Sequence, residues 1–242
     1  MNIHEYKLKG KVNKPRRVAL VADVHDRDAD LLLILLRAKR PDIIAVAGDL
    51  TNNKTRHAQK LRDTLLALAD IAPCFYSLGN HEYDFTDKSA RMVEECGVRL
   101  LLDEYENWNE LCIGGLRSRS KYRPFPKGRS TAPPRLGWLE DFERQPGYKI
   151  LLSHHPEYYK PYLRERNIDL VLSGHAHGGQ IRLFDHGLFA PGQGIWPEYT
   201  KGLHEGRFII SAGLANTEPM IPRLFNPTEL VIIDIEKEHP AV

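Results

Sequence analysis

Cysteine is scarce in this chain of 242 residues, which contains only Cys74, Cys96 and Cys112. Three cysteines cannot all pair with one another, and their spacing matches no zinc-binding pattern. The sequence therefore argues against both a disulfide framework and a structural zinc site. We expect all three to be small buried core residues of a protein in a reducing compartment, which favours a cytoplasmic location.

The chain also lacks a long apolar run. Lysines and arginines from Lys7 to Arg17 precede the apolar residues that begin at Val18, an order that resembles the charged start of a signal peptide. Asp23 and His25 interrupt that run, far short of the roughly 20 apolar residues that a membrane span needs. The sequence thus predicts no transmembrane segment and no export signal. A formal net charge of +2 is too small to indicate nucleic acid or membrane by itself.

The remaining composition is that of an ordinary globular protein, with 42% hydrophobic and 27% charged residues. The length suits one large domain or two small ones. No repeat, low-complexity tract or clear linker divides the chain. We therefore expect a single domain over residues 1–242, with its motif-bearing core at about 18–235.

Short apolar runs alternate with helical patterns, which is typical of parallel strands joined by right-handed crossovers. Strands are expected at 18–22, 43–47, 74–78, 108–113, 148–152 and 169–172, and helices at 30–39, 55–69, 86–96 and 158–166. Three later runs look like antiparallel strands, at 180–184, 207–211 and 229–235. The pattern predicts an α/β fold of two packed sheets flanked by helices.

Residues of the types that commonly bind metals follow directly after five apolar runs. Because ligands of open α/β sheets gather at the carboxyl ends of the strands, we expect one rim to carry Asp23, His25, Asp49, Asn80, His154, His175 and His177. Seven ligands are too many for one ion, but two ions bridged by one carboxylate use them all, and Asp49 stands mid-order as the natural bridge. Carboxylate, amide and imidazole ligands without thiolate suit Mn, Fe, Zn or Co.

A pair of metal ions indicates a particular chemistry. Two divalent ions about 3.5–4 Å apart share a water, make it hydroxide near neutral pH and clamp the oxygens of a phosphorus centre. The site therefore predicts phosphate ester hydrolysis through a metal-bridging hydroxide. His81 lies next to Asn80 but outside the ligand set, so we expect it to donate a proton to the leaving oxygen or to stabilise charge on the phosphoryl group.

These motifs together resemble a known family, the calcineurin-like metallophosphoesterases. The likeness rests on Asp23-x-His25, Gly48-Asp49, Gly79-Asn80-His81-Glu82, His154 and Gly174-His175-x-His177-Gly178-Gly179-Gln180. It is greatest to small bacterial phosphoesterases of the YkuE and YaeI type, which have segments similar to 151–156 and 225–227.

The resemblance implies a four-layer α-β-β-α sandwich of two mixed sheets flanked by helices. It also implies one metal on Asp23, His25, Asp49 and His177, and a second on Asp49, Asn80, His154 and His175. His81 matches the proton donor that is proposed for the family.

The chain departs from one familiar pattern of this family. Leu50 follows Asp49, where the protein serine/threonine phosphatases have Asp-Arg. Because a phosphate-binding arginine is missing there, we expect a phosphodiester or a small phosphomonoester rather than a phosphoprotein as the substrate.

Two alternatives stay open. The segment 117–135 contains seven Lys or Arg residues, four prolines and no acidic residue, so we expect an irregular basic loop. The loop is either a solvated surface segment or one that attracts a polyanion. In the second case the substrate is phosphorylated or polyanionic. One alternative is therefore a nuclease, with the loop along a groove and Tyr122 and Phe125 available to stack on bases. The other alternative is a metal-binding scaffold without turnover.

Three neighbouring motif residues have less direct roles. Glu82 is expected to cap the backbone of its loop rather than to act chemically, and Gly178-Gly179 to allow a tight turn. For His155 the sequence leaves open a contact with substrate, support of the ligands, or simple packing.

Overall fold

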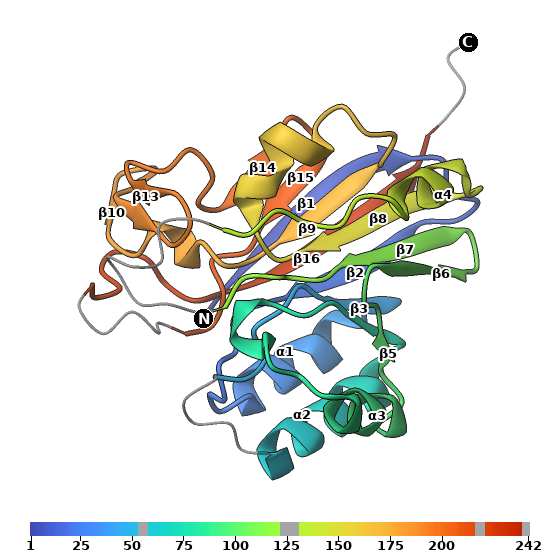
Figure 1. The fold of residues 1–242 in the computed structure, drawn as a ribbon, viewed down its shortest axis with the longest axis horizontal. Helices are drawn as coiled ribbons and strands as arrows, with labels where there is room; N and C mark the ends of the chain where they lie inside the picture. Colours follow the sequence, from blue (N-terminus) through green and yellow to red (C-terminus); the bar gives the residue numbers. More distant parts are fainter. Residues whose placement is uncertain (53–57, 122–130, 216–220, 239–242) are drawn as a thin grey trace.

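Two six-stranded sheets form the centre of the protein (Figure 1). The computed structural model describes residues 1–52, 58–121, 131–215 and 221–238. Tyr122, Phe125 and the first residues of the predicted helix 55–69 lie outside these ranges. The described parts of the basic segment, 117–121 and 131–135, contain neither helix nor strand, as predicted.

The first sheet has the strand order β1-β16-β2-β3-β4-β5. Its strands are β1 (Asn2–Gly10), β16 (Glu229–Lys237), β2 (Arg16–Val21), β3 (Ile43–Val46), β4 (Cys74–Tyr76) and β5 (Arg99–Leu100). Strands β2 to β5 run parallel, while β16 runs antiparallel to β2 and parallel to β1.

The second sheet has the order β14-β15-β9-β8-β7-β6. Its strands are β14 (Gly202–His204), β15 (Phe208–Ile210), β9 (Leu170–Ser173), β8 (Tyr148–Ser153), β7 (Leu111–Leu116) and β6 (Glu104–Trp108). Strands β7, β8, β9 and β15 are parallel. Two small hairpins follow β9 in the chain, β10 (Arg182–Leu183) with β11 (His186–Gly187) and β12 (Phe189–Ala190) with β13 (Gly194–Ile195).

Helices cover the outer face of each sheet. On the first sheet these are α1 (Asp30–Lys39), α2 (Ala58–Ile71) and α3 (Asp87–Glu95) (Figure 1). On the second sheet they are α4 (Leu139–Arg144), the 3₁₀ turn at Pro156–Tyr158 and the π-helical turn at Tyr159–Leu163. Two further 3₁₀ turns, Asn80–Glu82 and His177–Gly179, follow β4 and β9.

Alternate residues of the central strands enter different hydrophobic cores. In β2, Val18 and Leu20 face the second sheet, while Ala19 and Val21 face the helices α1 to α3. In β8, Ile150 and Leu152 join the core between the sheets, and Leu151 packs beneath α4. These segments are continuously apolar because their strands are buried on both faces of the sheet. Three cores between four layers confirm the predicted α-β-β-α sandwich.

Some expectations about individual elements are wrong. The predicted strand 108–113 is a hairpin, with a turn at Asn109 that has a left-handed backbone (φ 53°) between β6 and β7. The predicted helix 158–166 is a short π-helical turn over Tyr159–Leu163, because Pro161 has no N–H for regular α-helical hydrogen bonding. The late strands at 207–211 and 229–235 form, but each has one parallel and one antiparallel neighbour.

Strand β1 and helix α4 lie where no element was predicted. The alternation of lysines with Tyr6 and Leu8 in β1 is the pattern of an edge strand with one solvated face, which the similarity to a signal peptide obscured. Cys74, Cys96 and Cys112 are free and buried, as expected. Across the described residues, the helices are too short or too polar to cross a membrane.

We predict that Phe75→Ala destabilises the protein strongly. Phe75 is 1% exposed in the core between the sheets, and removing a buried aromatic ring costs about 3–5 kcal/mol. Urea unfolding followed by circular dichroism measures the change. The matched control is Leu66→Ala on the exposed side of α2, where Leu66 is 44% exposed, and we expect a change within about 0.5 kcal/mol. Equal losses in the two variants would contradict this account of the core.

Candidate metal centre

The predicted site residues converge where two parallel strand sets end. Strands β2, β3 and β4 of the first sheet lead to Asp23, His25, Asp49, Asn80 and His81. Strands β8 and β9 of the second sheet lead to His154, His175 and His177. All eight side chains are buried, and His175, at 6%, is the most exposed of them. The structure therefore brings together all seven candidate metal ligands and His81.

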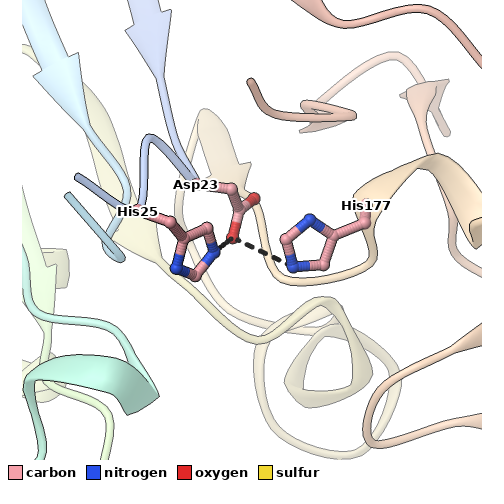
Figure 2. Close-up of side chains that lie close together, drawn as sticks. All are labelled: Asp23, His25 and His177. Atoms are coloured by element: carbon pink, nitrogen blue, oxygen red, sulfur yellow. Dashed lines mark ion pairs between the residues drawn. The ribbon is translucent and has the colours of Figure 1, made fainter. Parts of the chain in front are cut away.

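Asp23 lies between two imidazoles (Figure 2). Its Oδ1 atom is 3.6 Å from Nε2 of His25 and 3.8 Å from Nε2 of His177. The other oxygen, Oδ2, accepts a hydrogen bond of 2.9 Å from the backbone N–H of His175. One carboxylate oxygen is thus anchored by the backbone, and the other faces the two histidines.

Asp49 repeats this arrangement and joins the two sets of residues. Its Oδ1 accepts from the backbone N–H of His81 at 2.9 Å. Its Oδ2 lies 3.8 Å from Nε2 of His25 and 3.1 Å from Nε2 of His154. Because Oδ2 faces one histidine of each predicted ligand set, Asp49 occupies the position expected of a bridge.

Backbone carbonyls set the tautomers of two of the histidines. Nδ1 of His154 lies 2.7 Å from the carbonyl oxygen of Ala47, and Nδ1 of His177 lies 2.9 Å from that of Ala215. Since a carbonyl only accepts, Nδ1–H donates in both rings. Nε2 of each ring is then left to face the carboxylates, which is the usual support of a metal-binding histidine.

Nε2 of His154 is surrounded by acceptors. It lies 3.0 Å from Oδ1 of Asn80, in addition to its approach to Asp49. Burial disfavours the charged forms of both His154 and Asp49, but their mutual attraction raises the pKa of His154 to about 10 and lowers that of Asp49 well below its usual range. The protein groups alone therefore favour a proton here, and a metal ion satisfies the same acceptors.

Backbone strain is concentrated at this centre. Five of the nominated residues have left-handed backbones, with φ between 47° and 65°: Asp23, His25, Asp49, His175 and His177. Such conformations are unfavourable for residues with side chains and persist where the surroundings impose them, which is common at functional sites.

Close backbone approach explains the glycine that begins the Gly79-Asn80-His81-Glu82 motif. A Cβ atom on Gly79 would lie 2.1 Å from Oδ1 of Asp49. Glu82 then holds this turn against the end of β3, because its fully buried carboxylate accepts from the backbone N–H groups of Asp49, Gly79 and Thr51 at 2.7–3.1 Å. The predicted capping role of Glu82 is confirmed.

His81 packs edge-on against His25, with 4.5 Å between the ring centroids. Burial lowers the pKa of His81 to about 3, despite the opposing charge of Asp49. The ring is therefore neutral near pH 7 and has one N–H to donate.

Sequence reasoning assigned no role to three residues that support the centre. The Oγ atom of Ser118 lies 2.6 Å from Nε2 of His155. Asn226 donates to the carbonyl oxygen of His177 at 2.6 Å, and Arg223 donates to those of Ala212 and Ala215. The late Phe225-Asn226-Pro227 segment carried a signal as part of the family likeness. Ser118 and Arg223 carried none.

Gly178 and Gly179 have positive φ values of 63° and 79°, so the predicted tight turn is confirmed.

Several groups of these side chains could hold a metal ion. Within the described residues, the sets with ligand atoms close enough to share an ion include Asp23-His25-His177 and Asp49-His154-His175. Oδ1 of Asp23 and both ring nitrogens of His25 are buried without a hydrogen-bond partner among the described residues. Buried carboxylate and imidazole atoms left in this state fit cations.

Comparison with known proteins agrees with this geometry. The calcineurin-like phosphoesterase family matches residues 16–179. A metallophosphoesterase from Aquifex aeolicus, described as uncharacterized, is 30% identical over 238 residues, covering 94% of this chain and 81% of its own length. The chain therefore belongs to the calcineurin-like phosphoesterase family, which places it among the metal-dependent phosphoric ester hydrolases.

Other relatives are longer than this chain. It matches an uncharacterized metallophosphoesterase of Campylobacter jejuni at 25% identity and a putative one of Caenorhabditis elegans at 27%, but spans only 60% and 47% of their lengths. Among solved structures, a dimetal phosphatase from Danio rerio has the same fold, with a TM-score of 0.52 at 14% identity over 85% of this chain and 90% of that chain.

We predict that Gly79→Ala weakens metal binding and stability, because the new methyl group must displace Asp49. The expected loss of stability is about 1–3 kcal/mol, as for other overpacked sites. Mn content after dialysis and thermal unfolding measure the two effects. The control is Gly137→Ala, since a Cβ there has nothing within 4 Å. Unchanged Mn binding in Gly79→Ala would show that the position of Asp49 is not critical.

Proposed function

We propose that this protein hydrolyses a phosphodiester or a small phosphomonoester with two metal ions. Asp23, His25, Asp49 and His177 would hold one ion, and Asp49, Asn80, His154 and His175 the other. Family membership supports the reaction class and the use of two ions. The assignment of ligands is the one that the family resemblance implies, and the clusters Asp23-His25-His177 and Asp49-His154-His175 support it.

The observation that carries the proposal is the shared arrangement of Asp23 and Asp49. Each carboxylate gives one oxygen to a backbone N–H and turns the other toward imidazole Nε2 atoms at 3.1–3.8 Å. Two fully buried carboxylates are costly unless cations neutralise them. The donor set contains oxygen and nitrogen but no sulfur, which suits Mn, Fe, Zn or Co.

The metal ions would supply positive charge to the phosphoryl oxygens and lower the pKa of a water to make a nucleophile. The protein's own groups would orient the ligands and the substrate-facing turn. The carbonyls of Ala47 and Ala215 accept from Nδ1–H of His154 and His177 and so aim the Nε2 atoms inward, where a metal ion would take the place of a proton. Glu82 fixes the turn that presents Asn80 and His81.

His81 is our candidate for direct contact with the substrate. Its neutral ring can donate N–H to a phosphoryl or leaving oxygen. The negative charge of a bound phosphate ester would raise its pKa and so favour the protonated ring, which would transfer a proton to the leaving oxygen and return to its neutral form. Both roles that the sequence left open for His81 are retained in this form.

The substrate class rests on Leu50, which follows Asp49 in place of the Asp-Arg of phosphoprotein phosphatases. Nuclease activity stays a prediction. In the basic segment, Arg119 pairs with Asp103 at 2.9 Å, which partly neutralises a charge that a nucleic acid would need. A single domain and a cytoplasmic location also stay predictions.

We expect metal-stripped protein to regain hydrolysis of chromogenic phosphate esters when Mn is added. Asn80→Ala should lose activity and bind about one Mn fewer per chain. The matched control, Asn107→Ala on the exposed strand β6, should behave like the wild type. His81→Ala should keep both ions but lose about 100-fold or more in kcat. The ratio of diester to monoester turnover narrows the substrate class.

Metal-independent turnover, or full activity in Asn80→Ala, would contradict the two-metal proposal. Faster turnover of a phosphopeptide than of any diester or small monoester would contradict the substrate class. Tight Mn binding with no ester hydrolysis would favour the scaffold alternative.

A further inference from the structure

His155 and Glu157 extend the metal centre beyond the residues assigned above. They follow β8 and approach His175, which belongs to the proposed second ligand set. Oε1 of Glu157 is 3.4 Å from Nδ1 of His155 and 3.8 Å from Nε2 of His175. The rings of His155 and His175 have centroids 4.4 Å apart. These three side chains also lie close enough to share a metal ion.

The carboxyl group of Glu157 is largely buried and only partly hydrogen-bonded. Its side chain is 16% exposed, and its Oε2 atom is buried with no hydrogen-bond partner among the described residues. A carboxylate in this state would be stabilised by a nearby cation.

Several contacts hold this carboxylate toward His175. The Thr131 hydroxyl donates a hydrogen bond to Oε1 of Glu157. The backbone of Gly192, between β12 and β13, passes so close that a Cβ on it would lie 2.0 Å from the same oxygen. Ser118, in turn, contacts Nε2 of His155 at 2.6 Å. The orientation of Glu157 is therefore built by three separate segments of the chain.

The proposed ligand sets are unequal in charge. The first contains two carboxylates, Asp23 and Asp49. The second has only the shared carboxylate of Asp49, with neutral Asn80 where the first has Asp23. A divalent ion in the second set therefore has less negative charge around it. Glu157 stands beside the second set, where its carboxylate would add negative charge.

We propose that Glu157 supports the second metal-binding set through His175, whose Nε2 atom faces Oε1 of Glu157, and so strengthens the binding of the cation held by Asp49, Asn80, His154 and His175. This inference rests on the proposed two-metal function. Removing the carboxylate should weaken the binding of that cation and leave the cation of the first set in place.

The test is calorimetric titration of the metal-stripped full chain with Mn²⁺. The wild type should bind two ions, and the phase lost in Asn80→Ala identifies the second set. In Glu157→Gln the affinity of that phase should fall about tenfold or more, the effect typical of removing a supporting carboxylate, while the other phase stays unchanged. Glu157→Asp, which keeps the charge, should recover part of the loss.

Matched variants separate charge from packing. Thr131→Val removes a hydrogen bond of Glu157 but keeps its charge, so its effect should be smaller than that of Glu157→Gln. Glu205→Gln removes a carboxylate that pairs with Arg164 and should change neither phase.

Gly192→Ala tests the same idea without altering Glu157, because the new methyl group displaces the carboxylate. Its control is Gly194→Ala, which has a similar positive φ (79° against 73°) but nothing within 4 Å of the added Cβ. Should Glu157→Gln fail to fold by circular dichroism, this pair decides the question. A weaker second phase in Gly192→Ala alone supports the proposal, and equal behaviour of the pair overturns it.

The remaining outcomes are distinguishable. Two ions bound with unchanged affinity in Glu157→Gln would overturn the role of Glu157 and leave the proposed function standing. Three ions in the wild type, with the third lost in Glu157→Gln, would make His155-Glu157-His175 a separate site and also overturn the supporting role. Fewer than two ions in the wild type would refute the two-metal function itself.

Discussion

The burial of two carboxylates, Asp23 and Asp49, is the constraint on which the rest of this structure depends. Both are essentially inaccessible to solvent, and among the described residues the side chains within ion-pair distance of them are histidines. Burying a charge is expensive unless it is paired or bound to a metal. The surrounding structure meets this cost partly with backbone N–H groups and leaves the remaining oxygens for cations.

Meeting that constraint requires two sheets rather than one. The strands β2 and β3 lead to the two carboxylates, while β8 and β9 lead to three of the imidazoles that face them. The core between the sheets, with Leu20, Ile43 and Leu152 among its residues, keeps the two strand sets in register. A small shift of one sheet against the other would separate Asp49 from His154, so packing far from the centre controls its geometry.

Much of the fold could be predicted because its central strands are buried on both faces. Helix α1 has the predicted bounds, and α3 begins directly after Thr86, whose hydroxyl accepts from the backbone N–H of Ser89. Prediction failed where a local pattern had two explanations. The lysines of β1 suited both an edge strand and a charged leader, and the residues around Asn109 suited both a single strand and a turn. The pairing of β1 with β16, across more than 200 residues of sequence, decided the first case.

The candidate centre divides in the same way. The sequence by itself determined the kinds of candidate ligand and their order, because each of them follows an apolar run that ends at the same rim. They are Asp23, His25, Asp49, Asn80, His154, His175 and His177. Only the tertiary structure decided which atoms face one another, as where Nε2 of His154 meets Asn80 74 residues away and the N–H of His175 meets Asp23 152 residues away. It alone placed Glu157 beside His175 and Arg223 beneath the loop of Ala215. Strand ends can be read from local hydrophobicity, but contacts between distant loops depend on how the two sheets pack.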